Sequence, residues 1–522
     1  MLGPNIYYST TKVIYDPTTC PSVGSPSCAP FTNNIIPSSR LSKNGLAILN
    51  MYPAPTPGYL SGNQNWIAAA SQPENQRKET INSDIIPGQN DKIQFRRTAL
   101  AYFEVDPFDQ GTNLTPKEFN RPNQAGSVSW IHTFSPTLLN EARATVSLDD
   151  VYIPVITSAP GFNRQAFGID YPYIFPQGKD LPNKVPSVNV PNMYSFSGGP
   201  YPSHSTGPIY TVSDTVTKIW RNHTFKTGFF WERSGENDGD QINVNSVPGG
   251  SNNQNGTFSF SDGRTGLGAT SGVAVTNLAL GLADSYTEIG PRAYTIYRGF
   301  LYEWFAQDSW KVTQKLTVNY GIRQTINIPY KALWGNQIFF DPALYNAGQA
   351  PQIDPKTGNV IIGTGNAYNG MVIPGSGWPS SACGHGVTAA CSSQYNGLFQ
   401  NLPSYYIHIT NQFQPRLGIA YQVTDKTVVR TGVGRFLTRV GDGGGGGGNI
   451  FPGANSPFQP FETVTNVSVD NPGASLSNAQ QAPITTPLSS NYIQRLCQDG
   501  FSHIYAVYSS ITSQPSCAVI RR

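Results

Sequence analysis

Charged residues are scarce in this chain of 522 residues. Asp, Glu, Lys and Arg together make up 12% of the sequence, about half of the roughly 25% typical of soluble proteins. The 34 basic and 31 acidic residues nearly balance, for a net charge of +3, whereas nucleic-acid binding proteins usually gather a basic excess on one face. The composition therefore argues against a nucleic-acid partner, and an aromatic content of 12% argues against intrinsic disorder.

Long apolar runs are also absent. No 18 consecutive apolar residues occur, so no transmembrane helix is predicted. The N-terminal sequence MLGPNIYYST lacks the charged segment and following apolar segment of a signal peptide. These absences predict that the chain is cytosolic, that its start is missing, or that it is a fragment.

Motifs of catalysis and metal binding are missing as well. The sequence has no HExxH, GxSxG or SxxK, so metalloprotease and serine-hydrolase activities have no support. The glycine run at 441–448 is not followed by the Lys and Ser/Thr of a phosphate-binding loop. One weak calcium site is a candidate, with a solvated acidic loop as the alternative; its ligands would be Glu236, Asp238, Asp240 and Asn243. We expect no cofactor and no enzymatic activity.

Six cysteines are present, and none belongs to a CxxC motif, which argues against a zinc knuckle. They fall into three local pairs within stretches rich in Pro, Ser and Gly. Three disulfides in an oxidising compartment are predicted: Cys20 with Cys28, Cys383 with Cys391, and Cys497 with Cys517. The alternative is six unpaired thiols.

Hydrophobic residues recur with a period of two. In 316–323, Leu316, Val318, Tyr320 and Ile322 alternate with Thr317, Asn319, Gly321 and Arg323. Such alternation indicates strands with one apolar and one polar face. Eleven strands are predicted, at 92–105, 125–134, 138–152, 209–221, 223–235, 255–261, 285–291, 295–312, 316–327, 410–423 and 427–438. The segment 270–283 is expected to form a short helix on the side of the short turns.

The connections between these strands alternate in length. Short turns are expected at 135–137, 221–223, 313–315 and 424–426, and long loops at 153–208, 236–254, 328–409 and from 439 onward. This asymmetry is typical of outer-membrane β-barrels, whose long loops are extracellular, because most connections in compact soluble domains are about 4–6 residues. The predicted fold class is all-β, an antiparallel transmembrane barrel. The alternative is an antiparallel sandwich with a dry core.

The two faces of such a barrel have different surroundings. The apolar face would meet lipid, and aromatic residues such as Trp304, Trp310 and Tyr421 would form its interfacial girdles. The polar face would line the lumen. There it would pack against a plug or guide a polar solute, or it would form a purely structural wall of salt bridges. The charged residues predicted to line it are Glu141, Arg143, Arg233, Glu303, Lys311, Arg323, Arg416 and Arg430.

Several segments resemble one known family in their order and spacing. They are VIYDPTT at 13–19, FTNNIIPSSRLSKNGLAILNMYPAPTP at 31–57, QAGSVSWIHTFSPTLLNEARATV at 124–146, HTFKTGFFWERSGE at 223–236, FAQDSWKVTQKLTVNYGIR at 305–323 and NQFQPRLGIAYQVTDKTVVRTGVGRF at 411–436. This pattern is similar to that of Oar-like TonB-dependent outer-membrane transporters and covers most of 10–470.

The resemblance implies a 22-stranded barrel that holds an N-terminal plug and is energised through TonB. Eleven strands are half of that number, and the sequence shows no plug, no TonB box and no terminal aromatic strand. We therefore expect a fragment that forms an open half-barrel. Its predicted divisions are a plug-to-barrel junction and irregular segment at 1–90, barrel strands with long loops at 91–438, and a Gly/Pro-rich tail at 439–522.

The predicted function is energy-coupled uptake of an unidentified ligand through the outer membrane of a Gram-negative bacterium. The partners would be outer-membrane lipid, the TonB complex if a plug is present, and a small-molecule, glycan or peptide ligand. An adhesin-like surface protein without transport is the main alternative. A secreted carbohydrate-active enzyme is a third reading, but the paired carboxylates of that class are not found at strand ends.

Overall fold

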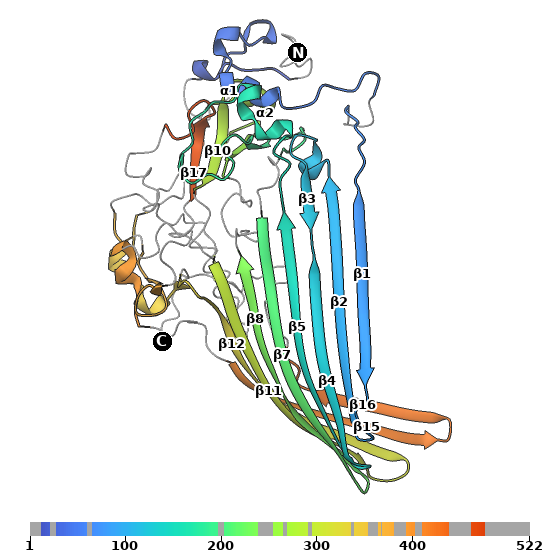
Figure 1. The fold of residues 1–522 in the computed structure, drawn as a ribbon. Helices are drawn as coiled ribbons and strands as arrows, with labels where there is room; N and C mark the ends of the chain where they lie inside the picture. The colour runs from blue at the N-terminus through green and yellow to red at the C-terminus, as the bar shows by residue number, and fades with distance from the viewer. Residues whose placement is uncertain are drawn as a thin grey trace.

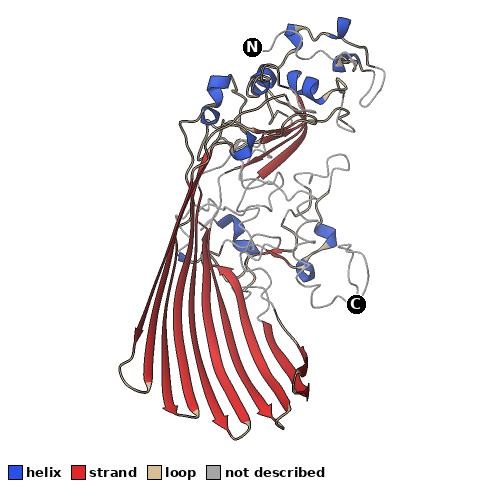
Figure 2. Ribbon diagram, turned by 90° about the vertical axis from the view of Figure 1, so that its right-hand side faces the viewer, coloured by secondary structure: helices blue, strands red, loops and turns tan. Residues whose placement is uncertain are grey.

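In the computed structural model, a large curved antiparallel sheet carries a smaller folded unit at one end (Figures 1 and 2). The structure describes residues 12–20, 28–59, 65–196, 203–238, 254–264, 269–290, 295–335, 339–352, 364–366, 368–380, 393–401, 410–437 and 461–474.

The large sheet contains eleven strands, the predicted number. They are β1 (Glu74–Ile85), β2 (Asp91–Asp106), β3 (Lys117–Asn120), β4 (Asn123–Ser135), β5 (Leu138–Ile153), β7 (Ser203–Trp220), β8 (His223–Asp238), β11 (Thr295–Lys311), β12 (Leu316–Ala332), β15 (Thr410–Thr424) and β16 (Thr427–Gly434). Each pairs antiparallel with its neighbours. β3 and β4 follow one another along the same line between β2 and β5, as two halves of one interrupted strand. Pro122 lies at the interruption, where its missing N–H suits a break in the ladder.

The connections confirm the predicted asymmetry. The turns β4–β5, β7–β8, β11–β12 and β15–β16 all lie at one end of the sheet, and the long connections lie at the other (Figures 1 and 2). The β1–β2 turn also lies at the short-turn end. We call the opposite end the loop end. The sheet is not closed: β1 and β16 are its two edges, and no other described strand pairs with either of them.

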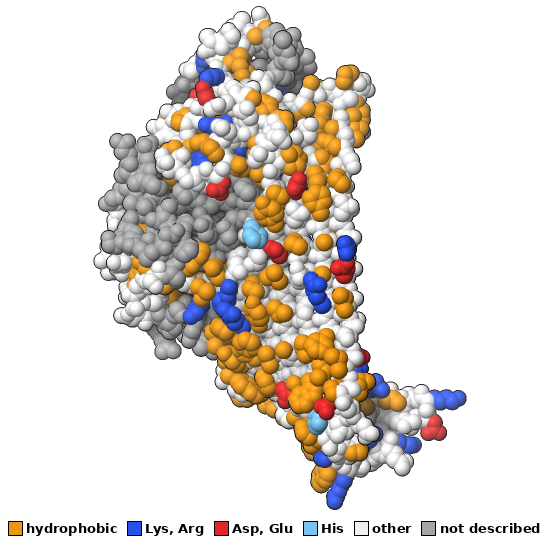
Figure 3. Space-filling model, in the orientation of Figure 1, with side chains coloured by type: hydrophobic (Ala, Val, Ile, Leu, Met, Phe, Trp, Pro, Cys, Tyr) orange, Lys and Arg blue, Asp and Glu red, His pale blue; other side chains and the backbone are white. Residues whose placement is uncertain are grey.

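The alternation of faces is confirmed on β12. Tyr320 and Ile322 are 45% and 47% exposed, and they share a face with Trp304 and Leu417 on the neighbouring strands. We call this side the apolar face. Figure 3 shows a broad apolar area across it. No second sheet of the described residues covers it, so the structure contradicts the sandwich alternative.

A separate unit at the loop end, here called the loop-end unit, has its own buried core. It contains a four-stranded sheet in the order β17 (Phe461–Ser468), β10 (Leu282–Ile289), β9 (Thr257–Ser259), β6 (Ser187–Asn189). The helices α1 (Lys43–Leu49) and α2 (Ala274–Ala279) pack in the same unit. Its core includes Ile48, Tyr171, Phe258, Leu278 and Tyr286, all fully buried. A two-stranded antiparallel sheet of β13 (Phe339–Phe340) and β14 (Met371–Val372) stands apart.

Several local predictions were wrong. The segments predicted as strands at 255–261 and 285–291 belong to the loop-end unit and not to the large sheet. The large sheet still has eleven strands because it also contains β1 and β3, which were not predicted. β17 was also missed, in a tail predicted to be irregular. The helix within 270–283 exists as α2, but it lies at the loop end and not beside the short turns.

The position of α2 follows from its contacts. Asp262 accepts a hydrogen bond from the backbone N–H of Ala274 at 2.8 Å, and Leu278 is fully buried in the core of the loop-end unit. The apolar residues of α2 are therefore covered by the core of the loop-end unit. No helix in the described ranges has the length and apolar character to cross a membrane.

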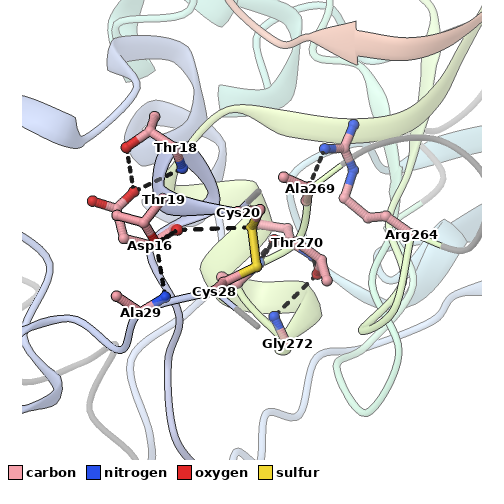
Figure 4. Close-up of a disulfide and its surroundings, with 12 residues drawn as sticks. Asp16, Thr18, Thr19, Cys20, Cys28, Ala29, Arg264, Ala269, Thr270 and Gly272 are labelled. Carbon is pink, nitrogen blue, oxygen red and sulfur yellow. Dashed lines mark hydrogen bonds between the residues drawn. A yellow bond between two sulfur atoms is a disulfide. The ribbon is translucent and has the colours of Figure 1, made fainter. Parts of the chain in front are cut away.

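One predicted disulfide lies within the described residues. Cys20 and Cys28 are bonded, with Cα atoms 4.2 Å apart, and Figure 4 shows the bond beside Thr270 and Gly272, which lead into α2. Next to it, Asp16 accepts two hydrogen bonds from the Arg40 guanidinium, at 2.8 and 2.9 Å. The disulfide and the ion pair together fix the entry into the loop-end unit. Cys383, Cys391, Cys497 and Cys517 lie outside the described residues.

Candidate functional site

The face opposite the apolar one is the candidate site, and we call it the polar face. Register places Arg323 opposite Phe305 and Gln414, and places Glu303 opposite Thr325. The six remaining predicted residues divide over the sheet, with Glu141 and Arg143 on β5, Lys311 on β11, Arg416 on β15, Arg430 on β16 and Arg233 on β8. That the polar face lines a lumen stays a prediction.

Two of these charges form an exposed pair. Arg143 donates to Glu141 at 3.1 Å and to the Ser129 hydroxyl at 2.8 Å. The side chains of Arg143 and Glu141 are 51% and 41% exposed, so solvent screens their attraction and the pair contributes little. β5 is separated from β11 by two strands, so this pair is not part of the site around Glu303.

A connected network surrounds Glu303. Its carboxylate accepts a hydrogen bond from Arg323 at 2.5 Å and another from the Thr325 hydroxyl at 2.8 Å. Thr325 in turn accepts from the Gln414 side chain at 2.7 Å, and the Gln414 amide oxygen accepts from the backbone N–H of Leu437 at 3.1 Å. Gln414 is buried. The network therefore joins three strands and the segment after β16 into one rigid polar patch.

A cavity of about 580 Å³ lies beside this network on the polar face. Its wall carries two arginines, each next to an aromatic ring. The Arg323 guanidinium lies 5.2 Å from the centre of the Phe305 ring, and that of Arg416 lies 4.7 Å from the centre of the Phe436 ring. Cation–π contacts of this kind hold an arginine in place without neutralising it.

Glycines form the floor of the cavity, where Gly321, Gly418, Gly432 and Gly434 stand on three adjacent strands. A side chain at Gly321 would place its Cβ 2.7 Å from the Cβ of Gln307 and 2.8 Å from the carbonyl oxygen of Ala306. The two strands therefore approach each other closely at this point, and the sheet is hollowed there on its polar face. A residue with a side chain would fill the hollow or push the strands apart.

The chemistry available in this cavity is recognition. Two fixed guanidinium groups offer hydrogen-bond donors to carboxylate, phosphate or backbone carbonyl groups, and the aromatic rings and bare glycine backbone accept a flat or extended group. The Glu303 carboxylate beside the cavity is occupied by Arg323 and Thr325. Among the described residues no group of His, Cys, Asp and Glu is arranged to hold a metal ion.

The predictions for two other sites have different outcomes. Arg233 is opposite Phe300 on β11 and Tyr210 on β7, so it lies on the apolar face. Its predicted place on the same face as Glu303 and Arg323 is therefore wrong. Of the calcium candidates, Asp240 and Asn243 lie outside the described residues, and for Glu236 and Asp238 only the backbone at the end of β8 is described. The calcium site stays untested.

Sequence reasoning missed the residues that complete the network and the cavity. Thr325 has the same phase as Arg323 in β12, and Gln414 has the same phase as Arg416 in β15, so the period-two pattern could have found both. No sequence signal marks the pairing of Phe436 with Arg416, because Phe436 follows the last residue of its strand.

Comparison with solved structures finds transport proteins at low similarity. The copper transporter OprC is 9% identical with a TM-score of 0.32, and the match covers 69% of this chain and 37% of that one. The FrpB iron transporter of Neisseria meningitidis is 7% identical with a TM-score of 0.31, and the match covers 72% of this chain and 38% of that one. The ferric-catecholate import receptor Fiu of E. coli K12 is 9% identical with a TM-score of 0.31, and the match covers 69% of this chain and 43% of that one. The chain thus spans less than half the length of each.

No relative is found among curated proteins. A family model described as an outer membrane beta barrel domain matches residues 5–512, which is nearly the whole chain. The open sheet, its exposed apolar face and its alternation of short turns and long loops agree with that match. The chain therefore belongs to the outer membrane beta barrel domain family, and it is a protein of the outer membrane.

Proposed function

We propose that this chain is the barrel portion of an Oar-like, TonB-dependent receptor that takes up a ligand across the outer membrane. The observation that carries the proposal is the cavity on the polar face, with Arg323 and Arg416 held in its wall by aromatic rings. A purely structural wall would pair both charges with acids, as Glu303 pairs with Arg323. Arg416 instead lies over Phe436, which leaves its guanidinium able to bind a passing or docked group.

The arrangement gives each part a role in uptake. The loop end faces the cell exterior and captures the ligand, because long loops are extracellular in this class of barrel. The polar face then borders the route through the barrel, and its arginines hold a mobile plug segment or the ligand itself. Glu303 and Gln414 fix the position of the wall, since each is fully engaged by neighbouring strands. The ligand would be a small molecule, a glycan or a peptide.

The test compares two adjacent positions on β11 in cells that produce the protein from its native gene. Gln307 borders the cavity on the polar face, and Ala306 has the opposite phase. Gln307→Cys and Ala306→Cys are labelled with a polar thiol reagent added outside the cell. In a TonB-dependent receptor, labelling of Gln307→Cys quickens when TonB is energised and slows when the proton gradient is collapsed. Ala306→Cys serves as the matched control, with no response to energy.

A binding protein without transport is the second candidate, and the loop-end unit favours it. This unit has its own core, a disulfide and a four-stranded sheet, which is more structure than a connecting loop needs. The same labelling experiment separates the two candidates. If the labelling rate of Gln307→Cys does not change with TonB or with the proton gradient, the result supports surface binding and contradicts uptake.

A further inference from the structure

Basic residues gather on the apolar face near the loop end, outside the site described above. Arg298 on β11 is opposite Lys331 on β12 and Gly235 on β8, and Arg233 is two residues before Gly235. The Arg298 side chain lies across Gly235, whose Cβ would fall 2.7 Å from the arginine Nη1. Figure 3 shows blue side chains above the broad apolar area on the left of the view.

The two arginines have no acidic neighbour among the described side chains. Arg233 acts electrostatically on Arg298 and repels it, and the other groups that act on Arg298 are Tyr210 and Tyr330. Arg233 also lies 5.8 Å from the centre of the Tyr210 ring. A pair of like charges on a lipid-facing surface is costly unless an anion lies between them.

The position of these basic residues along the membrane normal can be estimated from the short-turn end of the same strands. At the short-turn end His223 stacks on Trp310 with ring centres 5.4 Å apart, and Asp308 accepts a hydrogen bond from Tyr320 at 3.0 Å. These aromatic and polar groups mark one membrane interface. Arg233 follows His223 by ten residues on β8, which is about 33 Å along the strand and about 25 Å across the membrane at a tilt of roughly 40°.

That distance equals the height of the apolar band of an outer-membrane barrel, about 25 Å. Arg233, Arg298 and Lys331 therefore lie at the opposite interface, where the headgroups of the outer leaflet begin. We propose that these three residues bind the phosphate of a lipid headgroup in the outer leaflet. Guanidinium groups match phosphate oxygens with paired hydrogen bonds, and the exposed ring of Tyr210 supplies the amphipathic side chain typical of an interface.

The test uses protein purified in a neutral detergent from the outer membranes of cells that express its native gene. Native mass spectrometry measures the binding of a diphosphorylated lipid A and of the same lipid with its phosphates removed. We expect the wild-type protein to retain the diphosphorylated lipid at least tenfold more tightly, and the preference to weaken as salt is raised. Equal binding of the two lipids by the wild-type protein would overturn the proposal without any variant.

A charge-matched pair of double variants then assigns the site. Arg233→Gln with Arg298→Gln removes two charges from the group. Arg97→Gln with Lys218→Gln removes two charges elsewhere on the same face, where Arg97 is opposite Gly126 and Lys218 is opposite Phe225. The first double variant should bind the diphosphorylated lipid roughly tenfold more weakly than the second, since each basic residue near the surface adds to the attraction. Equal affinities of the two would place the lipid elsewhere and contradict the assignment.

Heat-modifiable migration on gels shows whether each variant has folded. If the first double variant does not fold, the single variants Arg233→Gln and Arg298→Gln are compared with Arg97→Gln in the same assay. The proposal depends on the orientation of the barrel and not on transport. A receptor that fails to respond to TonB could still bind this lipid, and the reverse also holds.

Discussion

Glu288 and Glu462 lie directly opposite each other in the β10–β17 pair of the loop-end unit, and both are buried. Their surroundings differ. Glu288 accepts hydrogen bonds from the backbone N–H groups of Ile174 and Phe175, at 3.0 and 2.9 Å, and from Lys179 at 2.6 Å. Burial raises the pKa of Glu462 to about 7, so this side chain is protonated in the folded unit at mildly acidic pH.

We predict that the attachment of β17 weakens as pH rises. The folded pKa of Glu462 lies above its ordinary value of 4.5, so the folded unit binds this proton more tightly than the unfolded chain does. Below pH 4.5 Glu462 is protonated in both the folded and the unfolded chain, so its burial costs no ionisation energy. Above pH 4.5 the unfolded chain gains stability by losing this proton, and at pH 7 the resulting loss in the free energy of unfolding reaches about 3 kcal/mol. Hydrogen exchange of the β17 amides at pH 5 and pH 8 measures the change.

Glu462→Gln is the control for that prediction, because it keeps the shape of the side chain and cannot ionise. The variant should hold β17 equally well at both values of pH and more tightly than the wild-type protein at pH 8. Comparing the two proteins at each pH cancels the intrinsic pH dependence of exchange. A wild-type protein that behaves as the variant does would show that Glu462 is not responsible.

A second prediction concerns the floor of the cavity. Gly321→Ala should destabilise the large sheet by about 1–3 kcal/mol, because the new methyl group meets Gln307 and the backbone of Ala306 below van der Waals distance. Gly418→Ala is the matched control, since its nearest atoms would be 3.8 and 3.9 Å away. Urea titration of both variants, purified in detergent from cells that express the native gene, checks the difference. Equal midpoints would mean that β11 and β12 are not closely apposed at Gly321.

The network around Glu303 leads to a third prediction. Glu303→Gln removes the charged partner of Arg323 and should lower the free energy of unfolding by about 1.5–3 kcal/mol, the range for hydrogen bonds to charged groups. Glu141→Gln removes the partner of Arg143 in an exposed pair and should cost less than about 1 kcal/mol. The same urea titration measures both. Similar losses for the two variants would show that the network is no stronger than a surface pair.

The large sheet was largely predictable, because its strands alternate strictly and its turns are short. Residues such as Val318 and Arg323 reveal their faces from sequence alone. β1 was not predicted, because its sequence does not alternate between apolar and polar residues. Its sequence ENQRKETINSDI is polar on both faces, with Arg77 and Glu79 on one and Lys78 and Thr80 on the other, so no period of two can be recognised.

The loop-end unit was not predictable, because its contacts connect distant parts of the chain. Asn44 donates its backbone N–H to Asp470 at 2.9 Å, and Arg264 donates to Asn466 at 2.7 Å. β9 and β6 have three residues each, too few to show a pattern. The rule that apolar strands belong to the barrel failed for β10, since its apolar residues Ala283 and Tyr286 face a protein core rather than lipid.

The disulfide gives a fourth prediction. Replacing Cys20 and Cys28 with Ala should destabilise the N-terminal part of the loop-end unit by about 2–3 kcal/mol, the loop-entropy value for so short a loop. Limited proteolysis should then cut within 12–59 faster, while the large sheet keeps its resistance. Arg40→Gln tests the adjacent ion pair with Asp16, and it should produce a smaller effect in the same region. Unchanged cleavage in the double Ala variant would contradict the prediction.

The last prediction concerns the open edges of the large sheet. The 522-residue chain by itself should not fold into a bilayer as a single sealed unit, because β1 and β16 leave backbone donors and acceptors that lipid cannot satisfy. β1 adds a second cost: Arg77 and Glu79 lie on the face that meets lipid on β2, opposite Ala101 and Ala99. The chain is refolded into liposomes beside a complete outer-membrane barrel as the control. We expect heat-modifiable migration and protease resistance for the complete barrel and neither for this chain alone. A compact, resistant species of monomer size from the chain alone would show that β1 and β16 can pair, and that the sheet closes without further strands.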